Sequence, residues 1–372
     1  MTVLFFSQTS IIKTHLCPNL CSGALQSFET QQEEGAARAS YPGSWSSTRS
    51  GLCCSTLKLV VGGVVGGVVV KYSSSSVDME EEGGLDSDGR TYSSRKEMWE
   101  AEAGEDPNGS DAKSIAKTLE WYHKGVSYWE SVEASVDGVL GGYGSVNARD
   151  VADSNAFILE MFNECPPSAG DLVALDCGAG VGRVTKNFLL HHFHEVDLVE
   201  PVHHFLDKAQ ADLGSNGTAR GSANSNNPKT HRAVNFYCTP LQDFTPEAGR
   251  YDVIWVQWCI GHLTDHDFIA FFKRAQGGLK PGGFFVLKEN IAKNGFVVDK
   301  TDSSVTRSDA YFRDLFKQTG LHLQKTKLQK GFPKDLFAVR MYALTSEPRG
   351  MSAPPSQPTR ASRHRNQPRK IH

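Results

Sequence analysis

Apolar runs and amphipathic segments alternate along the chain between residues 114 and 344. Short continuous apolar runs predict strands, and the longer mixed segments between them predict helices. The predicted strands cover 172–175, 196–199, 234–238, 251–258 and 279–288, and the predicted helices cover 203–213 and 265–277, with another opening at 184. Because strands alternate with helices, we predict an α/β domain at 113–345 with a doubly wound, mainly parallel sheet.

The two flanks of this region, and one segment inside it, lack the pattern. Residues 1–112 are rich in serine, glycine and acidic residues and predict a low-complexity, disordered extension, in which 78–88 is a solvated linker. Residues 346–372 predict a basic disordered tail, although such a tail can also bind nucleic acid or act as an import signal. Residues 215–230 predict a surface insertion.

Composition limits the environment and the partners. The formal net charge of −3 lacks the basic excess of a nucleic-acid-binding protein, so we expect no requirement for nucleic acid. The apolar stretch at 57–70 contains four glycines and is shorter than a membrane-spanning helix, so no membrane segment is predicted. The eight cysteines form no Cys-x-x-Cys units, which is typical of thiols in a reducing compartment. We expect a cytoplasmic and/or nuclear protein, while the N-terminal extension leaves organelle targeting open.

Histidines cluster at 191–194, but no second ligand group follows at a recognisable spacing. A surface patch at the end of a helix is therefore favoured over a metal site, and no metal is expected.

The most specific local pattern is an apolar strand that runs into a glycine-rich turn at 174–183. Gly178, Gly180 and Gly182 end the strand and a helix opens after them, so backbone N–H groups and a helix N-terminus face a ligand. The next predicted strand ends at Glu200, where a carboxylate can accept the hydroxyl groups of a ribose. This unit predicts a nucleotide-type ligand, but alone it does not distinguish dehydrogenases from methyltransferases.

A Leu-Lys-Pro-Gly-Gly turn at 279–283 precedes a predicted strand, and with the glycine turn it resembles the Rossmann-like class I methyltransferases. Other runs resemble the eukaryotic α-N-terminal protein methyltransferases, and they lie at 121–129, 136–144, 175–183, 241–246, 251–265 and 302–305. The resemblance implies N-terminal helical elements that bind the substrate and S-adenosylmethionine as the cofactor. It also implies methyl transfer to the α-amino group of proteins that begin Xaa-Pro-Lys once the initiator Met is removed.

The resemblance implies a set of cofactor-binding residues at the turn and at the strand ends. They are Gly178, Arg183, Glu200, Pro201, Val202, Leu241, Gln242 and Gln257. The chemistry of these side chains agrees, because Glu200 can accept both ribose hydroxyls and Arg183 can bind a carboxylate through two N–H groups. The amides of Gln242 and Gln257 can orient adenine or the methionine end without adding charge.

His262 and Asp302 match the catalytic pair of the family. The acceptor α-amine has a pKa of ~7.7–8.0, so a base must remove a proton before the amine attacks. Both residues also have structural alternatives. His262 fits a buried helix-cap histidine, and Asp302 fits the N-cap of a helix predicted at 304–316.

The same resemblance implies how the substrate is recognised. Asp299, Asp302 and Ser304 would receive the ammonium group of a lysine at the third position, and Asn290 would bind the backbone of the first residue. A pocket would hold the proline ring, and its walls would be Trp129, Leu140 and Trp258. Ordinary core packing is the alternative for the two tryptophans.

Three departures from the family pattern affect these predictions. Lys300-Thr301 lies between the two acidic positions, and the lysine weakens the local negative field. Glu289 replaces a commoner aspartate, and Phe337 stands where relatives have tyrosine, which puts one substrate hydrogen bond in doubt. Two other functions stay open: methylation of a small-molecule amine, and binding of protein N-termini without catalysis.

Overall fold

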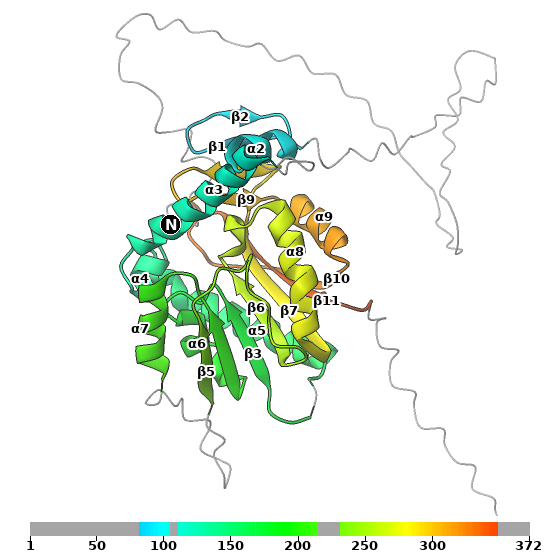
Figure 1. Cartoon of the computed structure of the whole chain (residues 1–372). Coiled ribbons are helices and arrows are strands. Elements are labelled where there is room, and N and C mark those ends of the chain that lie inside the picture. The colour runs from blue at the N-terminus through cyan, green and yellow to red at the C-terminus, as the bar shows by residue number, and fades with distance from the viewer. Residues whose placement is uncertain (1–81, 105–110, 168, 215–230, 349–372) are drawn as a thin grey trace, which may run out of the picture. The chain divides into compact units, whose positions relative to one another are not determined.

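A computed structural model describes residues 82–104, 111–167, 169–214 and 231–348 (Figure 1). The predicted insertion at 215–230, the N-terminal extension up to residue 81 and the basic tail from 349 lie outside these residues.

The central element is a seven-stranded sheet in the order β10-β11-β7-β6-β3-β4-β5. Five strands run parallel: β3 (Val173–Cys177), β4 (Glu195–Val199), β5 (Arg232–Tyr237), β6 (Tyr251–Gln257) and β7 (Leu279–Ile291). Two more are antiparallel at one edge: β10 (His322–Leu328) and β11 (Ala338–Thr345). Cys177 pairs with both Val199 and Val256, so the carboxyl ends of β3, β4 and β6 lie level. The predicted mainly parallel sheet is confirmed.

Helices cover both faces of this sheet. They are α5 (Asn147–Glu164), α6 (Arg183–Asn187), α7 (His203–Leu213), α8 (Asp265–Ala275) and α9 (Asp309–Thr319). Side chains of α5, α6 and α7 pack with Trp255 in one buried cluster, whereas α8 and α9 pack with Ile254 in another. Figure 1 shows α8 and α9 on the near side of the sheet. Strands β3 and β6 are buried at every position and mostly apolar, because helices cover both faces of the sheet there.

A second sheet has four strands in the order β2-β1-β8-β9. They are β1 (Gly84–Asp86), β2 (Thr91–Tyr92), β8 (Phe296–Asp299) and β9 (Ser304–Arg307). Strands β8 and β9 form an antiparallel hairpin, and β1 joins it parallel to β8. The hairpin follows β7 in the chain, so it lies near the carboxyl end of the central sheet.

The helix predicted at 304–316 is wrong in its first turn. Residues 304–307 are strand β9, where Val305 and Thr306 are β-branched and favour an extended backbone. The helix begins at Asp309, and its N-cap is Ser308, whose hydroxyl accepts the N–H of Tyr311 at 3.2 Å. Asp302 therefore lies in the turn of the hairpin and caps no helix.

The domain boundary predicted at residue 113 is also too late. Strands β1 and β2 and helix α2 (Arg95–Glu102) fold onto the domain, and Met98 and Trp99 are buried in its core. Asp86 lies within the predicted solvated linker, yet it is fully buried. Its carboxylate accepts the backbone N–H groups of Asp88 and Arg90, at 3.0 and 2.9 Å, which satisfies the buried charge.

Helix α3 (Ala112–Glu130) is the predicted N-terminal helical element. It begins at the N-cap Asp111, whose side chain accepts the N–H of Ser114. The short helices are α4 (Val136–Val139), η2 (Gly144–Val146), η3 (Leu189–His191), η4 (Ile260–His262) and η5 (Gln276–Gly278). Within the described ranges, no helix is both long enough and apolar enough to cross a membrane.

Replacement of Trp99 tests the docking of the segment 82–104. Its ring meets Trp121 edge to face, with centroids 5.5 Å apart, and its Nε1 donates to the hydroxyl of Tyr311 at 3.3 Å. We expect Trp99→Ala to lower the free energy of unfolding by about 3–5 kcal/mol in chemical denaturation, because the change leaves a cavity. The control is Leu119→Ala, since Leu119 is 64% exposed. Its expected change is below about 0.5 kcal/mol. Equal effects of the two variants would contradict the docking.

Candidate active site

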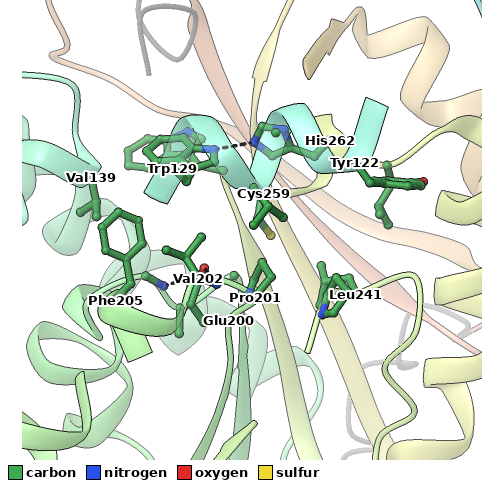
Figure 2. A pocket seen from close by; sticks show the side chains of 18 of the residues that line it. Tyr122, Trp129, Val139, Glu200, Pro201, Val202, Phe205, Leu241, Cys259 and His262 are labelled. Carbon is green, nitrogen blue, oxygen red and sulfur yellow. Dashed lines mark hydrogen bonds between the residues drawn. The ribbon is translucent and has the colours of Figure 1, made fainter. Parts of the chain in front are cut away.

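A cavity opens at the carboxyl ends of β3, β4 and β6, where open parallel sheets bind their ligands, and α3 passes across it (Figure 2). All of the residues that the sequence assigned to the cofactor line this cavity: Gly178, Arg183, Glu200, Pro201, Val202, Leu241, Gln242 and Gln257. Other lining residues were not predicted as site residues: Trp121, Tyr122, Val126, Phe205 and Cys259. The fold thus brings the predicted set together, while the individual roles stay predictions.

The glycine turn is tied to the neighbouring strand. The backbone N–H of Gly178 donates to the carbonyl oxygen of Val199 at 2.8 Å. Gly178 has a φ of +64°, and a Cβ at this position would lie 2.3 Å from the Cβ of Cys259. The position therefore requires glycine for its conformation and for the close approach.

Glu200 is buried beside this turn. One carboxylate oxygen accepts the N–H of Gly180 and the other accepts the N–H of Val202, both at 2.9 Å. Burial raises the pKa of Glu200 to about 7, although the two N–H groups act to lower it. The backbone therefore fixes the orientation of the carboxylate, and each oxygen still has a lone pair for a hydroxyl donor.

A buried network holds Arg183 and Gln257. Asp150 on α5 accepts hydrogen bonds from Arg183 Nη1 at 2.7 Å and from Gln257 Nε2 at 2.9 and 3.0 Å. The Nζ of the fully buried Lys288 lies 2.5 Å from the same carboxylate. Burial alone would raise the pKa of Asp150, but the charges of Lys288 and Arg183 hold it below its usual range. The sequence did not reveal Asp150 or Lys288, because 138 positions separate them.

The loop that carries Leu241 and Gln242 is shaped by an arginine from α8. Arg274 donates to the carbonyl oxygens of Leu241, Gln242 and Phe244, at 2.9, 2.8 and 2.8 Å. Leu241 is buried and Gln242 is half-buried. Arg274 was not predicted, because its contacts to backbone oxygens leave no local sequence pattern.

His262 is held by groups from two other elements. Its Nδ1 lies 3.1 Å from the carbonyl oxygen of Ser303, and its Nε2 lies 3.0 Å from the indole nitrogen of Trp129 (Figure 2). A carbonyl only accepts and an indole N–H only donates, so Nδ1 carries the proton and Nε2 is the acceptor. Trp121 donates to the backbone oxygen of His262 at 2.8 Å. The helix-cap alternative is wrong, since Thr264 caps α8.

A second cavity adjoins the first and shares Trp129, Trp258 and His262 with it. Its other lining residues are Gly261, Glu289, Asn290, Asp302, Ser304, Val305 and Thr306. Asp302 is buried, and its carboxylate accepts the hydroxyl of Ser304 at 2.6 Å. Most of the predicted substrate residues therefore lie on one surface next to the cofactor cavity.

Two of the predicted substrate residues lie outside both linings. Leu140 is fully buried and packs in a cluster with Trp129 and Trp258, so it supports the tryptophans from behind. Asp299 is buried opposite Ser304 in the hairpin. Burial, and then the charge of Asp302, raises the pKa of Asp299.

Glu289 and Phe337, two of the departures noted in the sequence, differ in their placement. Glu289 lines the second cavity, and one of its oxygens accepts the N–H of Asn290 at 2.8 Å. Burial raises the pKa of Glu289 to about 8, so this carboxyl is largely protonated at neutral pH. Phe337 is outside both linings and packs with Ala292 and Val297.

Two residues at the site have a left-handed backbone although neither is glycine. Trp258, which follows β6, and Ser303, in the hairpin turn, both have a φ of +53°. Ser303 supplies the carbonyl oxygen that binds His262. Such conformations are uncommon and concentrate at functional sites.

The histidines at 191–194 have structural contacts. His192 is half-buried and its Nε2 lies 2.6 Å from Oδ1 of Asn155, and His194 accepts the N–H of Leu172 at 2.9 Å. The predicted surface patch is therefore only partly exposed. In the part of the chain that the structure describes, no group of three or more His, Cys, Asp or Glu is arranged to hold a metal ion.

Comparisons with known proteins agree with this geometry. Residues 117–345 match the family described as AdoMet-dependent proline di-methyltransferases. Alpha N-terminal protein methyltransferase 1 of Arabidopsis thaliana is 56% identical over 292 residues, which cover 77% of this chain and 98% of that protein. N-terminal Xaa-Pro-Lys N-methyltransferase 1 of Homo sapiens is 40% identical over 230 residues, 62% of this chain and 97% of that protein. A solved SAM-dependent methyltransferase from Leishmania major aligns with a TM-score of 0.60 at 38% identity, covering 71% and 96% of the two chains.

The parallel sheet, the glycine turn and Glu200 define a class I methyltransferase that uses S-adenosylmethionine. Within this class, the chain belongs to the AdoMet-dependent proline di-methyltransferase family. Membership of this family confirms two predictions from the sequence. The protein is a methyltransferase of protein N-termini, and its cofactor is S-adenosylmethionine.

The donor set of the first cavity fits this cofactor. Glu200 offers oxygens to a diol next to the backbone N–H groups of the glycine turn, and Arg183 offers a cation to a carboxylate. Val202, Phe205 and Leu241 add apolar surface for a flat ring. These residues would hold the ribose, the methionine carboxylate and the adenine.

The pKa of Glu200 predicts that cofactor binding depends on pH. Ribose hydroxyls donate hydrogen bonds to the ionised carboxylate, so binding favours loss of its proton. The affinity for S-adenosylhomocysteine should therefore rise between pH of about 6 and about 8, measured by calorimetry. The Glu200→Gln variant should bind more weakly and lose this dependence. If the affinity of the variant changed with pH as much as that of the wild type, Glu200 would not be the cause of the pH dependence.

The pKa of Glu289 predicts a pH-dependent stability. In the unfolded chain this group ionises near its ordinary value, so its contribution is fully present at low pH and is lost as the pH rises to about 8. Glu289→Gln keeps a neutral side chain at every pH. The free energy of unfolding of the variant, relative to the wild type, should therefore increase between pH of about 5 and about 8 in urea denaturation. A difference that stays constant with pH would contradict the raised pKa.

Proposed function

We propose that this protein transfers methyl groups from S-adenosylmethionine to the α-amino group of proteins whose N-terminus reads Xaa-Pro-Lys. The observation that carries the proposal is the wall formed by Trp129, Trp258 and His262, which is shared by the two cavities. An amine bound in the second cavity would lie next to the first cavity, and His262 lines both cavities. The name of the human relative, N-terminal Xaa-Pro-Lys N-methyltransferase 1, specifies the same acceptor.

His262 is the proposed proton acceptor. S-adenosylmethionine supplies an electrophilic methyl group, and the amine must lose its proton before it attacks. The Nε2 of His262 already accepts a hydrogen bond from the indole N–H of Trp129. An ammonium N–H of the substrate would take the place of the indole donor, and Nδ1 would stay bound to Ser303.

The carboxylates of the hairpin favour a cationic substrate. Asp302 lies in the lining of the second cavity, and Asp299 is buried beside it with a raised pKa. Two neighbouring buried carboxylates repel each other, so a cation between them is stabilising. The third-residue lysine would supply that charge. Trp129 and Trp258 present aromatic surface that suits a proline ring.

The test uses peptides that begin Ser-Pro-Lys and an otherwise identical peptide with an acetylated α-amine. We expect mass spectrometry to detect methyl groups on the α-amine of the first peptide and none on the second. Methylation of small amines with no peptide turnover would favour the small-molecule alternative. Tight binding of the peptide without turnover would favour the non-catalytic alternative.

His262→Ala and Asp302→Asn test the assigned roles with the same peptide. We expect each to lower kcat by ~10²-fold or more, while the affinity for S-adenosylhomocysteine is retained. His266→Ala is the matched control, because this nearby histidine is 82% exposed and lies outside both linings. Wild-type rates in the two site variants would remove these residues from catalysis.

A further inference from the structure

Lys300 occupies an unexpected position for a residue inside a cation-binding turn. It follows Asp299 and precedes Asp302 by two residues, and Asp299 and Asp302 are the hairpin carboxylates. An ammonium group placed between them would occupy the site of the substrate lysine. The structure instead places Lys300 Nζ 3.8 Å from Asp86 and 3.8 Å from Glu102. Its ion pairs within the described residues are thus made with the segment 82–104.

We propose that the segment 82–104 acts in substrate recognition by holding the Lys300 ammonium away from the substrate cavity. Asp86 and Glu102 are the positioning residues. The hairpin carboxylates then stay available for the cationic third residue of a substrate. This inference rests on the proposed function, because it assigns a cation to that subsite.

The carboxylates of Asp86 and Glu102 are held in position by contacts that do not involve Lys300. The hydroxyl of Tyr92 lies 3.1 Å from Asp86 Oδ2 and 2.7 Å from Glu102 Oε1, so it bridges the two side chains. The other oxygen of Asp86 accepts the backbone N–H groups of Asp88 and Arg90. The side chain of Asp86 is 1% exposed and that of Glu102 is 12% exposed. The side chain of Lys300 is 37% exposed, so water partly screens its attraction to these two carboxylates.

Strand pairing brings these carboxylates to the hairpin turn. Asp86 pairs with Val298, and the N–H of Ser87 donates to the carbonyl oxygen of Val298 at 2.8 Å. The hydroxyl of Ser87 accepts the N–H of Lys300 at 3.2 Å. The backbone of Lys300 is thus attached to the same segment as its side chain.

The start of the segment clamps the base of the hairpin. Glu82 accepts the N–H of Gly295 at 2.7 Å and the hydroxyl of Ser308 at 3.4 Å. Gly295 has a φ of +49°, and a Cβ there would lie 1.8 Å from the carbonyl oxygen of Gly83. The two backbones can approach this closely only because Gly295 has no side chain.

The inference is tested by measuring KM with peptides that begin Ser-Pro-Lys and Ser-Pro-Gln, the second as a substrate or as a competitive inhibitor. Glu102→Gln weakens the hold on Lys300, so the KM for the lysine peptide should rise about 2- to 5-fold. The constant for the glutamine peptide should change less than that for the lysine peptide, because it does not depend on the third-residue charge. Damage to the fold would instead affect both peptides.

The double variant Glu102→Gln/Lys300→Gln provides the decisive comparison. Removal of the competing ammonium should return the KM for the lysine peptide to the wild-type value, and Lys300→Gln alone should not raise it. The matched control is Glu100→Gln on the same helix, since Glu100 is 46% exposed and pairs with Lys96. Thermal unfolding of each variant reports whether it is folded.

The outcomes separate this inference from the proposed function. A wild-type enzyme that methylates the lysine peptide, together with an unchanged KM in Glu102→Gln, overturns the inference and leaves the function standing. A raised KM that the double variant does not restore also overturns it, because the effect is then structural. If the wild type methylates no Xaa-Pro-Lys peptide, the function and the inference fall together.

Discussion

The rest of the site depends on the orientation of one imidazole ring. Trp121 and Trp129 of helix α3 bind the backbone oxygen and Nε2 of His262, and the hairpin carbonyl of Ser303 binds its Nδ1. Neither α3 nor the hairpin belongs to the central sheet, whose strand ends carry much of the lining of the first cavity. The central sheet, α3 and the hairpin therefore meet at His262, which lines both cavities.

The carboxylates of the site show how partners, as well as burial, decide ionisation. Asp150 is as deeply buried as Glu289, yet its pKa is lowered because Lys288 and Arg183 contact it, whereas the pKa of Glu289 is raised to about 8. Glu200 lies between these cases, because two backbone N–H groups oppose the effect of burial. The two buried carboxyl groups thus have pKa values shifted in opposite directions: that of Asp150, which contacts Arg183 and Gln257, is lowered, and that of Glu289, in the lining of the second cavity, is raised.

Local patterns predicted which residues the fold brings together in the first cavity, since the glycine turn and Glu200 lie within one strand-turn-helix-strand unit and are held by backbone hydrogen bonds. The contacts that hold Arg183 and Gln257 were missed, because Asp150 lies far from both in the chain. The segment 82–104 was missed for another reason. Its acidic residues suggested solvation, but Asp86 is satisfied by turn N–H groups and Trp99 anchors the segment in the core. The pattern of hydrophobic residues does not show that backbone N–H groups will bind a buried carboxylate such as Asp86.

The left-handed backbones of Trp258 and Ser303 have a consequence for the whole protein. Each such conformation costs on the order of 1–3 kcal/mol for a residue with a Cβ, and the surrounding packing must maintain it. Glycine at either position would relax the chain and also remove the side chain and the rigidity on which the site depends. At Ser303 the strained backbone and the carbonyl oxygen that binds His262 belong to the same residue, so a change that relieved the strain would also release the contact that orients the imidazole.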